Sequence, residues 1–182
     1  MRAPQKPGPR EGRIADMLRV DHAGEYGAVA IYRGQRAVFD RLPHKARIAA
    51  LLKDMEGGEA HHLLTFDRLL AERKVRPTLL APFWNAAGFS LGAATALMGE
   101  KAAMACTEAV EDVIEKHYAE QIGELEANEP ALAETVRQFR ADELEHKQTA
   151  EDEGAKDAPG YRLLSAAIRF GCRAAIKIAE KV

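Results

Sequence analysis

The chain has 182 residues and a formal net charge of -2, from 26 Lys and Arg against 28 Asp and Glu. This length suits a single domain with a buried core, and the balanced charge, without a Lys/Arg run, excludes nucleic-acid binding through bulk electrostatics. Cys106 and Cys172 lack a Cys-x-x-Cys spacing, so we expect two reduced, buried thiols and no disulfide framework.

The amino-terminal segment, residues 1–12, is predicted to be a disordered lead-in. It holds three prolines and two glycines and has no apolar core, so it is neither a secretory signal nor a convincing transit peptide. Residues 13–182 are expected to form one domain.

Apolar residues then recur at the helical period and predict four long helices. The first runs from Ile14 toward Pro43, the second over residues 44–73 with Pro77 as its stop, the third over residues 101–126, and the fourth over residues 130–153. Within the second helix, Gly57-Gly58 predicts close helix packing or a local distortion. No convincing strand is present, so the predicted class is all-α: an antiparallel four-helix bundle with one long crossover.

Two further segments are predicted to face a membrane. No charged residue lies between Pro77 and Gly99, and prolines and glycines interrupt this stretch. We favour a crossover helix that is partly buried and partly dipped into the membrane surface, with a wholly internal crossover as the alternative. The tail, residues 160–182, predicts an amphipathic helix with basic residues alongside its apolar side. Such a helix is typical of a membrane surface, although ordinary packing is an equal alternative.

Each half of the bundle carries a Glu-x-x-His pair, a spacing that puts both side chains on one helix face. Another Glu precedes each pair, by 34 residues in the first half and 32 in the second, which suggests a duplicated hairpin. The six residues are Glu25, Glu59, His62, Glu111, Glu143 and His146. This layout supplies the ligands of a carboxylate-bridged dimetal site.

Spacing alone leaves other ligands open. Glu56 and Glu108 lie one turn before Glu59 and Glu111, and Asp142 lies four residues before His146. His61 points away from His62 on a helix and is the weaker candidate. For His22 we expect a pocket-lining or surface role.

Burying four carboxylates together would drive protons onto them unless cations neutralised the cluster. Two divalent cations balance four carboxylates. Carboxylate-rich sites with one imidazole per metal suit iron or manganese better than zinc.

Several motifs resemble the demethoxyubiquinone hydroxylase family of ubiquinone biosynthesis, which belongs to the ferritin-like di-iron group. The resemblance covers Ile14 to Val182. The motifs are Arg19-Val20-Asp21-His22-Ala23-Gly24-Glu25-Tyr26-Gly27-Ala28, Val75-Arg76-Pro77-Thr78, Pro82-Phe83-Trp84-Asn85, Ala103-Met104-Ala105-Cys106-Thr107 and Asp142-Glu143-Leu144-Glu145-His146. The family pattern selects the six residues given above as ligands of two iron ions.

The resemblance implies a monooxygenase that uses dioxygen to hydroxylate the ring of a polyprenylated demethoxy-benzoquinol. It implies electrons ultimately from NADH, yet no Gly-x-Gly-x-x-Gly fingerprint of a dinucleotide-binding domain is present. Glu59 and Glu143 are then expected to bridge the metals, with Glu25 and Glu111 as terminal ligands. The pair His117 and Tyr118 resembles a family pair that helps electron or proton delivery, with packing as the alternative.

The implied location is the membrane periphery, on the cytoplasmic side of a bacterial cell membrane or the matrix side of the mitochondrial inner membrane. The longer leader of mitochondrial members is absent, which favours a bacterial or a truncated protein. The resemblance also implies a lipid-binding partner protein of the same pathway, and the sequence leaves a homo-oligomer open. Competing hypotheses are a ferritin-like ferroxidase, a manganese catalase-like enzyme and a non-enzymatic membrane adaptor.

Overall fold

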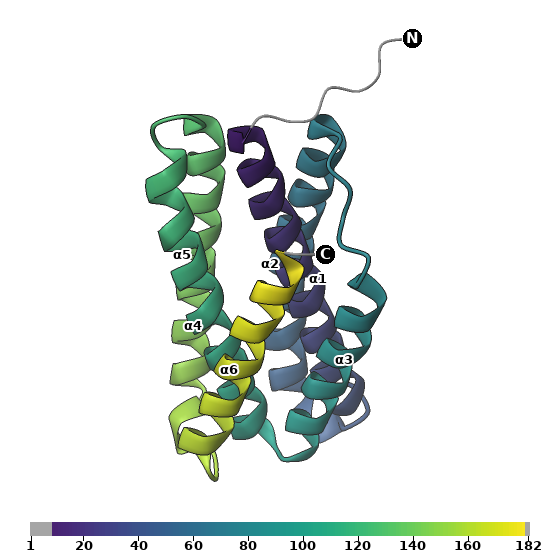
Figure 1. Cartoon of the computed structure of the whole chain (residues 1–182). Helices are drawn as coiled ribbons and strands as arrows, with labels where there is room; N and C mark the ends of the chain where they lie inside the picture. Colours follow the sequence, from purple (N-terminus) through teal and green to yellow (C-terminus); the bar gives the residue numbers. More distant parts are fainter. Residues whose placement is uncertain (1–8, 181–182) are drawn as a thin grey trace.

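The computed structural model describes residues 9–180, which are helical throughout apart from short connections and contain no strand (Figure 1). The helices are α1 (Pro9–Phe39), α2 (Ala46–Arg73), α3 (Ala81–Leu97), α4 (Glu100–Leu125), α5 (Pro130–Asp152) and α6 (Tyr161–Ala179), with 3₁₀ turns at Pro43–Lys45 and Ala155–Asp157. The all-α prediction is confirmed, and most helix boundaries lie within two or three residues of those predicted.

One predicted boundary was wrong, the start of the first helix. Helix α1 begins at Pro9, so the last four residues of the predicted lead-in are helical, while residues 1–8 lie outside the described part. A proline suits the first helical position, and Glu11 in the first turn complements the helix dipole. Helix α2 ends at Arg73, as predicted, but Pro77 is not what stops it. The helix ends because Lys74 adopts a left-handed conformation with φ 55° and Val75 N–H donates to Leu70 O at 2.9 Å.

The four bundle helices α1, α2, α4 and α5 share two apolar clusters, one toward each end of the bundle. One cluster includes Phe39, Ile48, Met104 and Ala150, and the other includes Leu18, Phe66, Leu125 and Phe139. On every one of these helices, the Glu and His positions predicted as ligands lie between the two clusters. The apolar ends therefore enclose a polar layer in the middle of the bundle.

Helix α3 lies against α1 along a contact made of glycines. A Cβ added at Gly92 would lie 2.0 Å from Ile31 O, and one added at Gly34 would lie 2.1 Å from Phe89 O. The two backbones approach closely because neither position carries a side chain. The predicted crossover helix is thus confirmed as a partly buried element, and its membrane contact stays a prediction.

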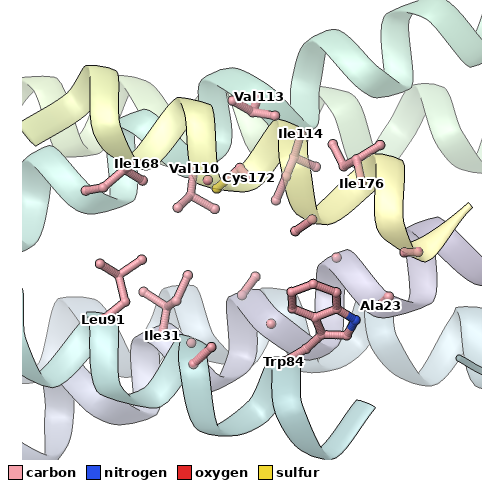
Figure 2. Close-up of a pocket in the computed structure, with 18 of the residues that line it drawn as sticks. Ala23, Ile31, Trp84, Leu91, Val110, Val113, Ile114, Ile168, Cys172 and Ile176 are labelled. Carbon is pink, nitrogen blue, oxygen red and sulfur yellow. The ribbon is translucent and has the colours of Figure 1, made fainter. Parts of the chain in front are cut away.

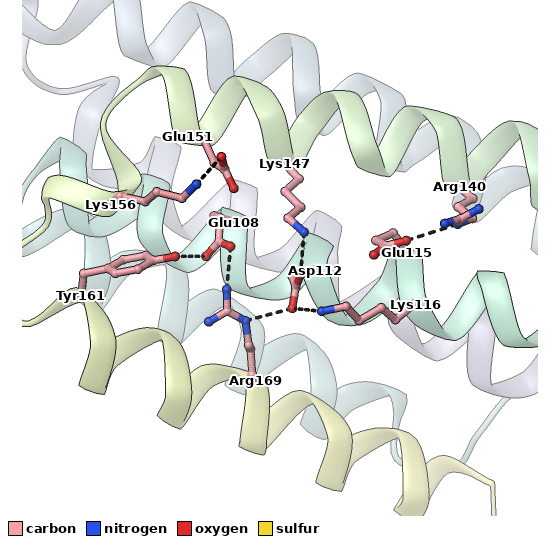
Figure 3. A network of polar contacts seen from close by, with 10 residues as sticks. All are labelled: Glu108, Asp112, Glu115, Lys116, Arg140, Lys147, Glu151, Lys156, Tyr161 and Arg169. Carbon is pink, nitrogen blue, oxygen red and sulfur yellow. Dashed lines mark hydrogen bonds and ion pairs between the residues drawn. The ribbon is translucent and has the colours of Figure 1, made fainter.

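Helix α6 is tied to α4 by a buried polar network (Figure 3). The Arg169 guanidinium donates to Glu108 Oε1 at 2.6 Å and to Asp112 Oδ2 at 3.0 Å. Although burial opposes ionisation, hydrogen bonds from Lys116 and Lys147 lower the pKa of Asp112 to about 2, so this carboxylate stays charged beside Arg169. The tail helix therefore packs on the bundle through its polar side as well as its apolar side.

Among residues 9–180, no helix is both long and apolar enough to span a bilayer.

The glycine contact between α1 and α3 gives a stability prediction. Gly92→Ala should lower the free energy of unfolding by about 1–3 kcal/mol, because the added methyl group overlaps the Ile31 carbonyl. The matched control is Gly123→Ala in α4, where an added Cβ meets nothing within 4 Å; this variant should gain roughly 0.5–1 kcal/mol from helix propensity. Urea unfolding of both variants measures the difference, and equal midpoints would contradict the tight contact.

Candidate metal centre

The structure brings together the six side chains that the sequence singles out. They supply two groups of potential ligand atoms, and within each group the atoms lie within 4.8 Å of one another. The first group is Glu25, Glu59, His62 and Glu143, and the second is Glu59, Glu111, Glu143 and His146. Since Glu59 and Glu143 belong to both groups, the arrangement can hold two metal ions with two carboxylates shared between them.

The two histidines turn the same ring nitrogen toward this centre. His62 Nδ1 lies 3.2 Å from Glu143 Oε1 and 3.6 Å from Glu25 Oε2, and His146 Nδ1 lies 2.8 Å from Glu59 Oε1. None of these contacts has the geometry of a hydrogen bond, and both Nδ1 atoms are buried without a partner. Each nitrogen is therefore directed at a position that a cation would fill.

Unpartnered oxygens show the same pattern. Glu59 and Glu143 each leave both carboxylate oxygens buried without a hydrogen-bond partner, whereas Glu25 and Glu111 each leave one. With the two imidazole nitrogens, this makes eight orphaned atoms in six residues. Buried polar atoms without partners are costly, and a whole cluster of them fits a site for cations. Glu59 and Glu143 can thus each offer two oxygens, and Glu25 and Glu111 can each offer one. This donor set suits a carboxylate-bridged pair of metals.

Two tyrosines explain why Glu25 and Glu111 leave only one oxygen free. Tyr32 OH on α1 donates to Glu111 Oε1 at 2.7 Å, and Tyr118 OH on α4 donates to Glu25 Oε1. Each tyrosine follows the Glu of its own helix by seven residues and contacts the Glu of the other helix. The repeated Glu-x₆-Tyr spacing was a signal available in the sequence, and we missed Tyr32.

Burial dominates the electrostatics of the centre without cations. Desolvation raises the pKa of Glu25, and it raises those of Glu59 and Glu111 well above the usual value, with Glu143 nearby adding to the effect. At Glu143, contacts with His146 and His62 outweigh the cost of burial and lower the pKa to about 2. Burial thus opposes the ionisation of Glu25, Glu59 and Glu111, and bound cations would supply compensating positive charge.

The alternative carboxylates have other partners. Glu56 accepts from Arg33 and Arg36, at 3.2 and 2.6 Å, and points away from the centre. Glu108 belongs to the Arg169 network (Figure 3). Asp142 does not reach the central atoms but contacts the outer nitrogen of His62.

The remaining histidines lie outside the cluster. His22 is buried, with Nε2 2.9 Å from Asp67 Oδ1, so a surface role is wrong. The pocket-lining role expected as the alternative stays a prediction. His61 is exposed. His117 Nε2 lies 3.4 Å from the buried Asp21 carboxylate, in a separate polar cluster, so of the His117–Tyr118 pair only the tyrosine reaches the centre.

An apolar cavity of about 560 Å³, partly open to the outside, lies between α1, α3, α4 and α6 (Figure 2). Its lining includes Gly24 and Val110, the residues that precede Glu25 and Glu111 in the sequence. Figure 2 shows Trp84 and Leu91 of α3 facing Val110 and Ile114 of α4 and Cys172 of α6 across it. All its lining residues are apolar or glycine, apart from the indole nitrogen of Trp84 and the thiol of Cys172. The sequence predicted apolar helices here but not the space between them, because a cavity depends on how the helices pack.

The fold and the centre define a class: an all-α bundle protein with a buried carboxylate–histidine cluster able to hold metal. Residues 12–179 match the model of the family described as "Ubiquinone biosynthesis protein COQ7", and the chain belongs to this family.

Curated relatives agree with this assignment. The chain is 48% identical to the 3-demethoxyubiquinol 3-hydroxylase of Rhodospirillum rubrum, over all of this chain and 84% of the relative. It is 47% identical to the mitochondrial NADPH-dependent 3-demethoxyubiquinone 3-hydroxylase of Mus musculus, over 91% of this chain and 76% of the relative. It is also 43% identical to the mitochondrial 5-demethoxyubiquinone hydroxylase of Saccharomyces cerevisiae, over 91% of this chain and 77% of the relative.

The environment of the two thiols gives a prediction for chemical labelling. Burial raises the pKa of Cys106 to about 12 and that of Cys172 to about 11. Because only the thiolate reacts, about 0.1% of Cys172 is reactive at pH 8, and its labelling rate should rise about tenfold per pH unit up to pH 10. Iodoacetamide labelling followed by mass spectrometry measures both rates. Cys106 should react only after unfolding in urea, and fast reaction of Cys106 in the folded chain would contradict the packing.

Proposed function

We propose that this chain is a dimetal monooxygenase that hydroxylates the ring of a polyprenylated demethoxyubiquinol. The proposal rests mainly on one observation: eight buried ligand atoms lack partners in a bundle that also holds an apolar cavity lined by the sequence neighbours of Glu25 and Glu111. The chain that carries them belongs to a family of ubiquinone biosynthesis. A ferroxidase would use similar ligands but has no need of the cavity, so the hydroxylase is the better hypothesis.

The metals of the proposal are two iron ions. Four carboxylates and two imidazoles make a donor set rich in oxygen, which suits iron or manganese better than zinc. Glu59 and Glu143 would be shared by both ions, Glu25 and His62 would complete one half-site, and Glu111 and His146 would complete the other. When bound, the iron pair supplies the dioxygen activation that ring hydroxylation requires.

The protein's own contribution is positioning and exclusion of water. Tyr32 and Tyr118 each occupy one oxygen of a terminal carboxylate, so Glu111 and Glu25 are oriented with the other oxygen toward the centre. The apolar clusters at both ends of the bundle keep water from the central layer. A reactive oxidant formed there would be protected from solvent.

The proposed substrate fits the apolar cavity. An isoprenoid tail has no hydrogen-bonding groups, and the lining offers it almost only carbon. Trp84 Nε1 is buried without a partner and provides a donor for an oxygen of the substrate.

The source of electrons is a separate part of the proposal. We predicted NADH from the resemblance, while the names of several eukaryotic relatives specify NADPH. The reductant proposed is therefore a reduced nicotinamide dinucleotide, with His117 and Tyr118 as candidate residues for electron or proton delivery.

The substrate's tail also requires access to a membrane. Helices α3 and α6, which flank the cavity, expose large apolar side chains: Leu79, Phe83, Leu97 and Met98 on or next to α3, and Leu163, Phe170 and Ile178 on α6. Arg162 and Arg173 of α6 add positive charge for anionic lipid headgroups. We propose peripheral binding to the membrane predicted above through this surface, and we retain the lipid-binding partner protein and a homo-oligomer as predictions.

The metal proposal predicts the behaviour of a ligand variant. The wild-type chain loaded with Fe²⁺ should bind two metal ions, and Glu143→Gln, which removes a shared ligand, should bind fewer and lose at least about 100-fold in hydroxylation. Glu145→Gln on the same helix removes an exposed charge and should retain both properties. Metal analysis and turnover of a prenylated demethoxyquinol measure the two effects. Full hydroxylation by Glu143→Gln would refute the proposal.

The membrane proposal predicts a flotation result. The wild-type chain should float with liposomes that contain anionic lipid, and the Phe83→Ser/Phe170→Ser variant should bind at least tenfold more weakly, because about 1.5–3 kcal/mol is lost per buried phenylalanine. Leu64→Ser changes an exposed apolar residue on α2 and serves as the control that still floats. A wild-type chain that stayed in the aqueous fraction would contradict this surface.

A further inference from the structure

The six central residues and the two tyrosines correspond between the two halves of the centre, but a residue next to each Glu-x-x-His pair does not. Glu25 and Tyr32 of α1 correspond to Glu111 and Tyr118 of α4, and Glu59 and His62 of α2 correspond to Glu143 and His146 of α5. The residue before the Glu-x-x-His pair differs: it is Asp142 on α5 and Gly58 on α2.

This difference falls on the outer nitrogens of the two imidazoles. His62 Nε2 lies 3.0 Å from Asp142 Oδ2, so the ring has a carboxylate on one side and the centre on the other. His146 Nε2 has no such partner among residues 9–180. It faces Gly58, where an added Cβ would lie only 3.3 Å from it. Gly58 therefore leaves room for the His146 ring but offers it no acceptor.

The packing around the rings reinforces the difference. His62 is 1% exposed and stacks on Phe139, with ring centroids 4.0 Å apart. The His146 side chain is 14% exposed, and its ring lies edge-on to the Tyr32 ring, with ring centroids 6.4 Å apart. His62 is thus held on its outer edge and on one face, whereas His146 has more freedom to turn.

We propose that the two metal half-sites are inequivalent, with Asp142 as the positioning residue that makes the Glu25/His62 half-site bind its cation more tightly than the Glu111/His146 half-site. A carboxylate on the outer nitrogen of a ligating histidine fixes the ring and increases its basicity, and losing such a partner typically lowers metal affinity by about 10–100-fold. This inference rests on the proposed dimetal function, and it concerns the order of loading, which that function leaves open.

The test is an anaerobic titration of the metal-free full chain with Fe²⁺, read by competition with a chelator. The wild-type chain should bind two ions in separate steps, with affinities about 10–100-fold apart. Asp142→Ala should lower the Fe²⁺ affinity of the first binding step by about the same factor, so that the two steps merge into one. Asp142→Asn retains an acceptor for His62 Nε2 without the charge, so it should restore part of the separation.

Two controls separate positioning from general effects. Glu145→Gln removes a nearby exposed charge on the same helix, and Asp67→Asn alters an Asp–His pair outside the centre, with His22. Neither should change the two steps. As a spectroscopic readout, one equivalent of ⁵⁷Fe²⁺ should give mainly one Mössbauer environment in the wild-type chain and a mixture in Asp142→Ala.

The possible failures are distinguishable. A wild-type chain that binds two ions with one shared affinity would overturn the inference and leave the proposed function intact. The inference would also fail if Asp142→Ala retained both steps, or if Glu145→Gln merged them equally. A wild-type chain that bound no metal would instead refute the proposed function itself.

Discussion

Four carboxylates buried in the middle of a helical bundle are the constraint on which the rest of this structure depends. Without cations, burial favours the protonated form of most of them, and the pKa values of Glu25, Glu59 and Glu111 are raised accordingly. Such a cluster is costly in a protein interior unless positive charge is bound there. The apolar clusters on both sides increase this cost, and they also provide the dry environment in which cations would be held most strongly.

The bundle meets this constraint by using one hairpin arrangement twice. Each hairpin supplies a single Glu from its first helix and a Glu-x-x-His pair from its second. The tyrosines connect the two halves, because each donates to the terminal Glu of the other hairpin. A duplicated arrangement would make two identical half-sites, and the Asp142/Gly58 difference is where this chain departs from that symmetry.

Local patterns made the helices and the six central residues predictable from the sequence. Helical periodicity marked the four bundle helices, an uncharged apolar stretch marked the crossover helix α3, the amphipathic tail marked α6, and the Glu-x-x-His spacing marked the centre. Contacts between helices that are distant in the sequence could not be predicted from local patterns. Tyr32 donates to Glu111, which is 79 residues further along the chain. Glu108 lies one turn from Glu111 but faces Arg169. Spacing along one helix cannot decide which of two neighbouring carboxylates faces the core, because the packing of a second helix determines it.

Helix α1 carries the proposed metal ligand Glu25 and also lines the apolar cavity. Gly24 and Gly27 flank Glu25 on α1, both line the cavity, and a Cβ added at either would meet nothing within 4 Å. A side chain at either position would extend into the space that the cavity now occupies. In the motif His22-Ala23-Gly24-Glu25-Tyr26-Gly27-Ala28, the glycines therefore keep the cavity open beside the turn of α1 that carries a proposed metal ligand. One turn of α1 thus carries both a proposed metal ligand and part of the lining of the apolar cavity, the two features on which the proposed function rests.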